Sequence, residues 1–482
     1  MSESSSTQED NLPQPSSVFL VVLFVSAAIQ LLFAMQEPWL NRPPKSVGDG
    51  LQYENIAFHL WSTSEYRFDN SSPDWRLTYE AASSQLEKDR GEADYSVHLD
   101  APKRNLLASD RPPLYPMIVA GLYSILGRGT VAFVATHLFS HLCLALSSAL
   151  AAVVVLRLSQ ICFPQLSGRV TIGLAFLPMV FTITNRTLQS YTSDFLTEPL
   201  AIVLLQGVVL MLHDLSSTSS NGRARVLQSV LAGVSLGALI LTRSVIVLWL
   251  PGWLLLLVLL PASSRKSAFQ HAACVILVAC VLCSPWWIRN IAVTGRFLPL
   301  GTQGTIALLG GYNKWSWEDG GEWRYEAEQE LRSNLRQEEA WRAADSDLER
   351  ELLVYDAARG ELSRFVRTHL ADLPRIAVAR TVTHWNPYSG KSLIWKGLII
   401  LGVGLLVVKC RNLRPGDGDS NYLKATTILY LGLPILSTLM AAILYTVGGR
   451  FLLPSYGLLN TLAALGAAAI LHPLYHRIRR RH

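Results

Sequence analysis

The stretch 47-VGDGLQYENIAFHLW-61 follows the first long apolar run of the chain, and the rest of the sequence can be interpreted from it. Its apolar and aromatic residues recur at i, i+3, i+4, i+7 and i+8, a pattern that predicts a helix with one face on an apolar surface. Those residues are Tyr53, Ile56, Ala57, Leu60 and Trp61. Asp49 stands where this helix would begin, so its carboxylate could meet both a water-soluble and a lipid-borne substrate.

Asp49 has two interpretations from these residues alone. Asp is a favoured N-cap residue, and Gln52 three positions later completes a capping-box pattern. The second interpretation is chemical, with the carboxylate acting on a substrate. Capping is the more common role of Asp at a helix start, so the choice between the two depends on the rest of the chain.

Composition places the chain in a membrane. Of its 482 residues, 50% are hydrophobic and only 16% are charged, whereas soluble domains carry roughly 25% charged residues. The net charge of +6 does not indicate a nucleic-acid partner, because the basic residues cluster beside apolar runs. We therefore expect an all-α polytopic membrane protein. The candidate spans are 18–35, 131–156, 170–184, 195–213, 226–241, 245–260, 269–288, 392–408, 425–447 and 451–471, with 114–127 apolar but short.

Lys and Arg are concentrated in alternate connections, which is the positive-inside pattern when 114–127 dips into the membrane without crossing it. The domain organisation then follows. Residues 1–17 are a disordered cytoplasmic tail, and 18–288 form an N-terminal membrane module with an outer loop at 36–112. Residues 289–391 are a second extracytoplasmic section, and 392–482 contain the last spans and a basic cytoplasmic tail.

In this topology, ionisable residues at span ends gather on the outer face, which favours a site there. Each also has an ordinary structural explanation. Acids are common in the first turn of a helix, and arginines often anchor a span at the interface. Three arginines that converge could instead bind a phosphate. The residues concerned are Asp49, Glu54, Arg111, Asp194, Glu198, Arg243, Arg289 and Arg450.

Metal-binding patterns are weak in this sequence. The six cysteines form no CxxC pair. Two Asp-x-Asp strings occur, at 345–347 and 417–419, but neither follows a Gly-rich phosphate loop or a βαβ pattern. We interpret both strings as incidental and predict no metal site.

An ordered set of short motifs carries a family resemblance. These are Gly48-Asp49-Gly50 with Tyr53 and Ala57, Arg111-Pro-Pro-Leu-Tyr-Pro116, Thr197-Glu-Pro-Leu200, Pro285-Trp-Trp-Ile-Arg-Asn290 with Gly295 and Phe297, Gly310-Gly-Tyr-Asn313, and Arg450-Phe-Leu-Leu-Pro454. In order and spacing, the set resembles the GT-C superfamily of integral membrane glycosyltransferases. It is most similar to the bacterial relatives of the protein O-mannosyltransferases and the lipid A aminoarabinose transferase.

The resemblance implies a bundle of about 10–12 transmembrane helices, each needing ~20 apolar residues, with two large extracytoplasmic sections. It also implies sugar transfer from a polyprenyl-phosphate carrier to a lipid, glycan or protein hydroxyl, with inversion. The site would face outward from a bacterial inner (plasma) membrane. Asp49 matches the general base of the family, although many relatives have paired acids where this chain has Asp49-Gly50. The expected phosphate-binding residues are Arg289, Arg243, Arg450 and Arg111, and further substrate-binding candidates are Tyr53, Glu54, Asp194, Glu198, Tyr312 and Asn313.

Two other functions stay open at this point. A transporter or flippase for lipid-linked sugars would share the membrane setting, although we find no internal repeat of the kind expected for one. A glycan ligase or polymerase would use lipid-diphosphate donors. For the transferase, the phosphate leaving group is already activated, so no cofactor is required, and a weakly bound divalent cation remains open.

Overall fold

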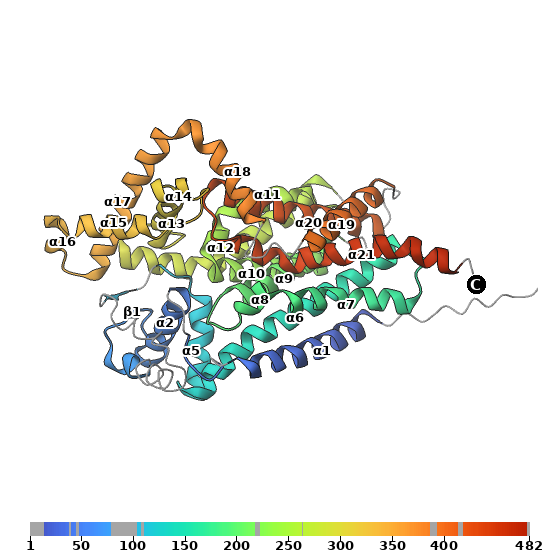
Figure 1. Ribbon diagram of the computed structural model, residues 1–482, viewed down its shortest axis with the longest axis horizontal. Coiled ribbons are helices and arrows are strands. Elements are labelled where there is room, and N and C mark those ends of the chain that lie inside the picture. The colour runs from blue at the N-terminus through green and yellow to red at the C-terminus, as the bar shows by residue number, and fades with distance from the viewer. Residues whose placement is uncertain are drawn as a thin grey trace, which may run out of the picture.

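The computed structural model describes residues 14–37, 40–44, 48–78, 104–107, 110–216, 222–262, 264–385, 393–412 and 418–479. The first 13 residues of the expected tail, parts of the 36–112 loop, Asp417 of the second Asp-x-Asp string and the last three residues lie outside the described residues. The described chain is almost entirely helical (Figure 1), so the all-α prediction is confirmed. One short antiparallel ladder pairs β1 (Phe68–Asp69) with β2 (Asn105–Leu106).

Among the described residues, eight helices are long and apolar enough to cross a membrane, so the chain is an integral membrane protein. They are α1 (Pro15–Gln36), α6 (Thr130–Cys162), α9 (Glu198–Ser216), α10 (Gly222–Thr242), α12 (Arg265–Thr294), α19 (Leu393–Asn412), α20 (Gly418–Ile443) and the continuous pair η4 (Arg450–Ser455) and α21 (Tyr456–Arg479). Three shorter apolar segments are α5 (Leu114–Leu126), α7 (Gly168–Thr184), and η1 (Ser244–Trp249) with α11 (Leu250–Leu259).

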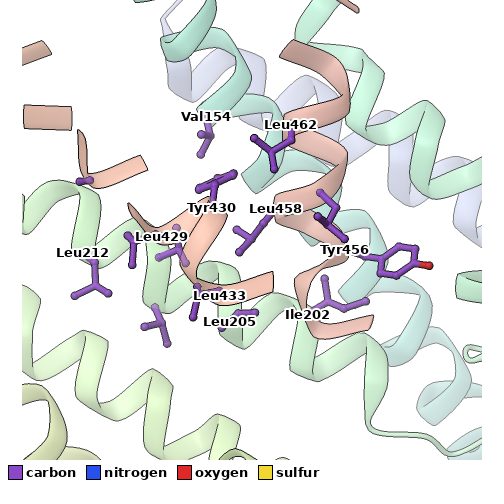
Figure 2. Close-up of a cluster of buried hydrophobic side chains, with 14 of the residues drawn as sticks. Val154, Ile202, Leu205, Leu212, Leu429, Tyr430, Leu433, Tyr456, Leu458 and Leu462 are labelled. Atoms are coloured by element: carbon purple, nitrogen blue, oxygen red, sulfur yellow. The ribbon is translucent and has the colours of Figure 1, made fainter. Parts of the chain in front are cut away.

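The core of the bundle lies where α6, α9, α20 and α21 meet. Figure 2 shows side chains from these helices directed toward one another, including Leu205, Leu433 and Leu458. At the edge of the core, α19 crosses α21 so closely that a Cβ on Gly402 would lie 2.0 Å from the Leu462 carbonyl oxygen. Small residues allow such close backbone approach between membrane helices. Any larger residue at Gly402 would force these two helices apart.

The polar sections gather at one end of the bundle (Figure 1). That end holds α2 (Asp49–Thr63) and the outer section, which comprises α13 (Gln303–Gly311), α14 (Lys314–Glu318), α15 (Glu326–Leu335), α16 (Glu339–Ala343), α17 (Asp347–Thr368), η2 (Leu370–Asp372) and α18 (Leu373–His384). The start of α1 and the end of α21 lie at the opposite end. The polar sections therefore lie at the opposite end of the bundle from the start of α1 and the end of α21.

A buried arginine fastens the outer section to the bundle. Arg380 of α18 donates hydrogen bonds to the carbonyl oxygens of Gly321 (3.0 Å), Gly311 (2.6 Å) and Ala442 (3.3 Å). Since Ala442 lies near the end of α20, one side chain joins α13, the loop after α14 and a membrane span. The outer section is therefore held in a defined position over the last spans.

Candidate charged site at the start of α2

Helix α2 is more deeply buried than its sequence pattern predicts. Tyr53, Ile56 and Ala57 are buried as expected, but Glu54 and Phe58 on other sides of the helix are buried too. The reason is that α5 covers one side of α2, while β1 and β2 cover another through Phe68 and Leu106 against Ile56. The interpretation of a helix with one buried face was therefore too narrow.

The capping-box interpretation of Asp49 and Gln52 is wrong. Gly48 is the N-cap, with a positive φ of 120° that favours glycine. Asp49 is the first helical residue, and the Gln52 side chain accepts a hydrogen bond from Arg111 Nε at 2.5 Å. The side chains of Asp49 and Gln52 thus turn toward Arg111 rather than back to the helix backbone.

Two arginines from distant parts of the chain hold the Asp49 carboxylate. Arg111 Nη2 lies 2.8 Å from Asp49 Oδ1, and Arg450 Nη1 lies 2.7 Å from Asp49 Oδ2. Arg111 stands in the segment before α5, and Arg450 begins η4. Asp49 itself keeps 22% of its side-chain surface exposed. Each carboxylate oxygen therefore has a cation, yet the group remains within reach of solvent.

A second acid continues the arrangement inward. Glu198, the first residue of α9, is fully buried, and its Oε1 accepts hydrogen bonds from Arg243 Nη1 at 2.6 Å and from Arg450 Nε. Arg243 also lies 3.5 Å from the Thr197 hydroxyl. Glu198 is therefore a buried bridge between two arginines, and Arg450 links it to the more exposed Asp49. We refer to Asp49, Arg111, Glu198, Arg243 and Arg450 as the charge cluster.

The charge cluster contains three guanidinium groups and two carboxylates. A third acid, Asp110, lies at its edge, with Oδ2 4.0 Å from Arg111 Nε, and burial raises the pKa of Asp110. Burial alone would raise the pKa of Asp49, but the positive charges of Arg111 and Arg450 outweigh burial and hold that pKa well below its usual range. Asp49 is therefore ionised at neutral pH.

Aromatic rings surround these charges. The guanidinium carbon of Arg111 lies 5.7 Å from the Tyr53 ring, and that of Arg450 lies 5.7 Å from the Tyr191 ring. Tyr445, which the sequence did not single out, packs edge-on against Phe451 with ring centroids 5.0 Å apart. Burial raises the pKa of Tyr445 to about 12, although Arg243 and Arg450 act in the opposite direction. Its hydroxyl therefore stays protonated and can donate a hydrogen bond.

Arg289, the first expected phosphate ligand, is linked to the charge cluster through Tyr66. Its Nη2 donates to the Tyr66 carbonyl oxygen at 2.9 Å, and its guanidinium lies 5.1 Å from the Trp286 ring. The Tyr66 hydroxyl in turn donates to the Arg111 carbonyl oxygen at 3.1 Å. The structure thus pairs Arg111 and Arg450 with Asp49, and Arg243 with Glu198. Arg289 lies outside the charge cluster and is connected to it through Tyr66.

Glu54 lies one turn beyond Asp49 in a different environment. It is fully buried and accepts hydrogen bonds from Trp75 Nε1 at 2.6 Å, the Tyr123 hydroxyl at 3.0 Å and Arg128 Nε at 2.9 Å. These contacts join α2 to α5 and to the short segment at Trp75. We interpret Glu54 as a structural carboxylate. Sequence reasoning missed Arg128, because an arginine in a short turn carries no distinguishing signal.

The three remaining candidates have local structural contacts. The Asp194 carboxylate accepts a hydrogen bond from the Phe195 amide at 2.9 Å. The Tyr312 hydroxyl donates to the Ile443 carbonyl oxygen, next to the Arg380 anchor. Asn313 is the N-cap of α14 and accepts from the Ser316 amide at 2.8 Å. Each of these contacts stabilises the framework around the charge cluster.

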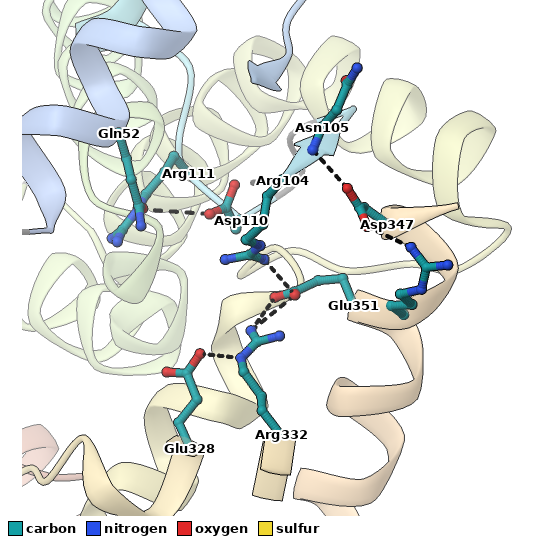
Figure 3. A network of polar contacts seen from close by, with 10 residues as sticks. Gln52, Arg104, Asn105, Asp110, Arg111, Glu328, Arg332, Asp347 and Glu351 are labelled. Atoms are coloured by element: carbon teal, nitrogen blue, oxygen red, sulfur yellow. Dashed lines mark hydrogen bonds and ion pairs between the residues drawn. The ribbon is translucent and has the colours of Figure 1, made fainter. Parts of the chain in front are cut away.

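The segment that carries Arg111 is positioned by the outer section (Figure 3). Arg104 Nη2 lies 2.7 Å from Glu351 Oε2 of α17, and Glu351 also binds Arg332 of α15 at 2.9 Å. The Asn105 amide donates to Asp347 Oδ2 at 2.8 Å. Asp347 of the first Asp-x-Asp string thus has a structural contact. In the part of the chain that the structure describes, no group of three or more His, Cys, Asp or Glu is placed to hold a metal.

No family model and no curated protein matches this sequence. Among solved structures, the chain is similar to the archaeal oligosaccharyltransferase AglB from Archaeoglobus fulgidus, in complex with an inhibitory peptide and a dolichol-phosphate. The TM-score is 0.49 at 11% identity, over 96% of this chain and 52% of that one, so the chain spans about half the length of that enzyme. It is also similar to ArnT from Cupriavidus metallidurans bound to undecaprenyl phosphate, with a TM-score of 0.39 at 14% identity over 92% and 77% of the two chains. With TM-scores below 0.5 at 11% and 14% identity, neither likeness assigns a family or a chemistry to this chain.

Proposed function

We propose that this protein is a glycosyltransferase that moves a sugar from a polyprenyl-phosphate carrier to a hydroxyl group of a lipid, glycan or protein acceptor. The reaction takes place at the extracytoplasmic face of a bacterial inner membrane and inverts the anomeric carbon. The observation that carries the proposal is the charge cluster itself. A partly exposed carboxylate lies within ion-pair distance of two arginines, one of which also binds a buried glutamate, at one end of a membrane bundle.

Asp49 and the three arginines of the cluster each have a role in this reaction. Asp49 accepts the proton of the acceptor hydroxyl while its oxygen attacks the anomeric carbon. The bond between that carbon and the phosphate oxygen breaks, and the polyprenyl phosphate departs with the electron pair. Arg111, Arg243 and Arg450 stabilise the negative charge that grows on the departing phosphate. The protein's own residues can supply each step, so the proposal requires no cofactor. It is also compatible with a weakly bound divalent cation at the phosphate.

The membrane setting favours a lipid-linked donor. The phosphate of a polyprenyl-phosphate sugar lies at headgroup depth, and Arg243 and Arg450 lie at span ends. The Lys and Arg bias of the sequence places this end of the bundle outside, where nucleotide sugars are generally not supplied.

The test uses the full chain in nanodiscs, offered a panel of polyprenyl-phosphate sugars with a labelled sugar and, separately, the matching nucleotide sugars. We expect transfer of label from a lipid donor and none from nucleotide sugars. Transfer from a nucleotide sugar with lipid donors excluded would overturn the proposal. In proteoliposomes, movement of a lipid-linked sugar across the bilayer without transfer would favour the flippase alternative instead.

A further inference from the structure

The donor phosphate and Asp49 require the same two guanidinium groups. In the structure, Asp49 uses both carboxylate oxygens to bind Arg111 and Arg450, at 2.8 and 2.7 Å. Under the proposed function, these arginines must also bind the phosphate of the donor. A guanidinium group has five donors, but each of these two already has further partners. Gln52 accepts from Arg111, with Asp110 at 4.0 Å, and Glu198 accepts from Arg450. In the structure, the Asp49 carboxylate therefore occupies the position between Arg111 and Arg450 where the donor phosphate would bind.

We infer that the donor phosphate displaces Asp49 from Arg111 and Arg450, so that Asp49 becomes an effective base only when donor is bound. This inference rests on the proposed function and assigns an order of events to that same site. Donor binding precedes activation of the acceptor. An acceptor that arrives first meets a carboxylate that is still paired with two cations.

The difference in burial between Asp49 and Glu198 determines which carboxylate the phosphate displaces from the arginines. Glu198 is fully buried and shares its Oε1 between Arg243 and Arg450, whereas Asp49 is 22% exposed at the first turn of α2. Separating a buried carboxylate from its cations leaves an uncompensated charge and is strongly unfavourable. A partly exposed carboxylate can be rehydrated. Asp49 therefore leaves, while Glu198 stays and keeps Arg243 and Arg450 side by side for the phosphate.

The exchange also changes the basicity of Asp49. In the donor-free protein, burial would raise the Asp49 pKa, but Arg111 and Arg450 hold it well below its usual range. General base catalysis is most effective when the pKa of the base lies near the working pH. Loss of two cationic neighbours and the arrival of a phosphate anion both raise the pKa of a carboxylate. Donor binding thus converts a weak base into a stronger one.

The first experiment measures binding of a polyprenyl phosphate without a sugar to the full chain in nanodiscs. Asp49→Asn removes the competing carboxylate, so we expect the affinity for the lipid phosphate to rise about tenfold or more. A tenfold gain corresponds to ~1.4 kcal/mol of binding free energy. Glu198→Gln is the matched control, because it removes one negative charge from the same arginines without removing the competitor. We expect no such gain in Glu198→Gln, since Arg243 and Arg450 lose the group that holds them together.

The outcomes separate the two proposals. Equal or weaker binding by Asp49→Asn, or an equal gain in Glu198→Gln, would overturn the competition. If the wild-type protein transfers sugar from a lipid donor in either case, the proposed function stands. If the wild-type protein neither binds a lipid phosphate nor transfers from a lipid donor, both proposals fail.

A second experiment needs only the wild-type protein. The pH dependence of kcat/KM for the donor reports the donor-free enzyme, and that of kcat reports the complex. We expect the acid limb of kcat to lie at higher pH than that of kcat/KM, because the Asp49 pKa rises on donor binding. Coincident limbs would contradict the inference. The groups that act on Asp49 or share its surroundings are Arg111, Arg243, Arg450, Glu198, Tyr53, Tyr445 and Asp110.

Discussion

Two networks of arginines and acids at the same end of the molecule are built differently. The network of Arg104, Glu328, Arg332 and Glu351, here called the outer tie, has two cations and two anions. In the charge cluster, the ion pairs shorter than 3 Å join three cations to two anions, and a third acid, Asp110, lies 4.0 Å from Arg111. A balanced network holds segments together and leaves no demand for a further ion. A network whose close pairs offer three cations to two anions holds segments together and leaves a cation less fully paired, as the proposed phosphate site requires.

The largest effect should come from Asp49→Asn. General base catalysis contributes roughly 10²–10⁴-fold in rate, so we expect sugar transfer to fall by about that factor. The variant should fold, since Gly48 rather than Asp49 caps α2 and Asn can still accept hydrogen bonds. Transfer from the lipid donor and the thermal unfolding temperature are measured together. Normal transfer in the folded variant would show that Asp49 is not the general base. The charge cluster would then have a structural role only, like the outer tie.

Arg450→Ala should have the next largest effect, because Arg450 contacts both acids of the cluster. Loss of one charge-assisted contact costs about 1.5–3 kcal/mol, which is roughly ten- to over a hundredfold in kcat/KM for the donor at ~1.4 kcal/mol per decade. Arg289→Ala should weaken donor use less, since Arg289 reaches the cluster through Tyr66. Steady-state kinetics with varied donor and fixed acceptor test this order. A larger loss in Arg289→Ala would move the phosphate site toward Trp286.

Glu351→Gln should disrupt the outer tie and lower stability, but it should leave the rate of sugar transfer unchanged. The side chain is buried and paired with Arg104 and Arg332, so we expect the free energy of unfolding to fall by about 1–3 kcal/mol. Arg104 is one-third exposed, which keeps the loss toward the lower end of that range. The unfolding midpoint and the transfer rate per folded molecule are the measurements. A hundredfold loss of kcat without loss of stability would show that the comparison between the two networks is mistaken.

The smallest effect is expected for Asp356→Asn. This residue pairs with Arg296 at 2.6 Å, but both side chains are 40% exposed or more. Exposed ion pairs contribute at most about 1 kcal/mol, so stability and transfer should stay close to wild type. This variant is the control for loss of an acid from the polar end of the molecule. A marked drop in transfer would indicate that the outer section contacts substrate.

The helical fold was predictable because long apolar runs need a membrane, but the breaks within those runs were less so. The apolar run 245–260 predicts one span. The structure instead has η1 followed by α11, with Pro251 at the start of the second helix. Proline lacks the amide needed to continue a helix, which explains the break. The 3-10 segment η1 packs against α10 and α20. Its length depends on these contacts, which are remote in sequence, so the apolar pattern alone could not predict it.

The members of the charge cluster were predictable one at a time, as ionisable residues at span ends. Their pairing was not, because Arg450 meets Asp49 across most of the length of the chain. The same limit explains why Asp49 read as an N-cap, since its true partners are remote in sequence. Tyr445 was missed for a different reason. A tyrosine after a membrane span normally marks the interface, and only the packing against Phe451 distinguishes it.

The contacts of Arg380 bear on when this protein can become complete during its synthesis. The arginine emerges after Gly311 and Gly321, but its third acceptor, Ala442, is 62 residues further along the chain. Arg450, which pairs with Asp49, comes later still. Chains are made from the N-terminus, so the third contact of Arg380 can form only after the chain has been made as far as Ala442. A chain that stopped before residue 442 would therefore lack both the third contact of Arg380 and the pairing of Arg450 with Asp49.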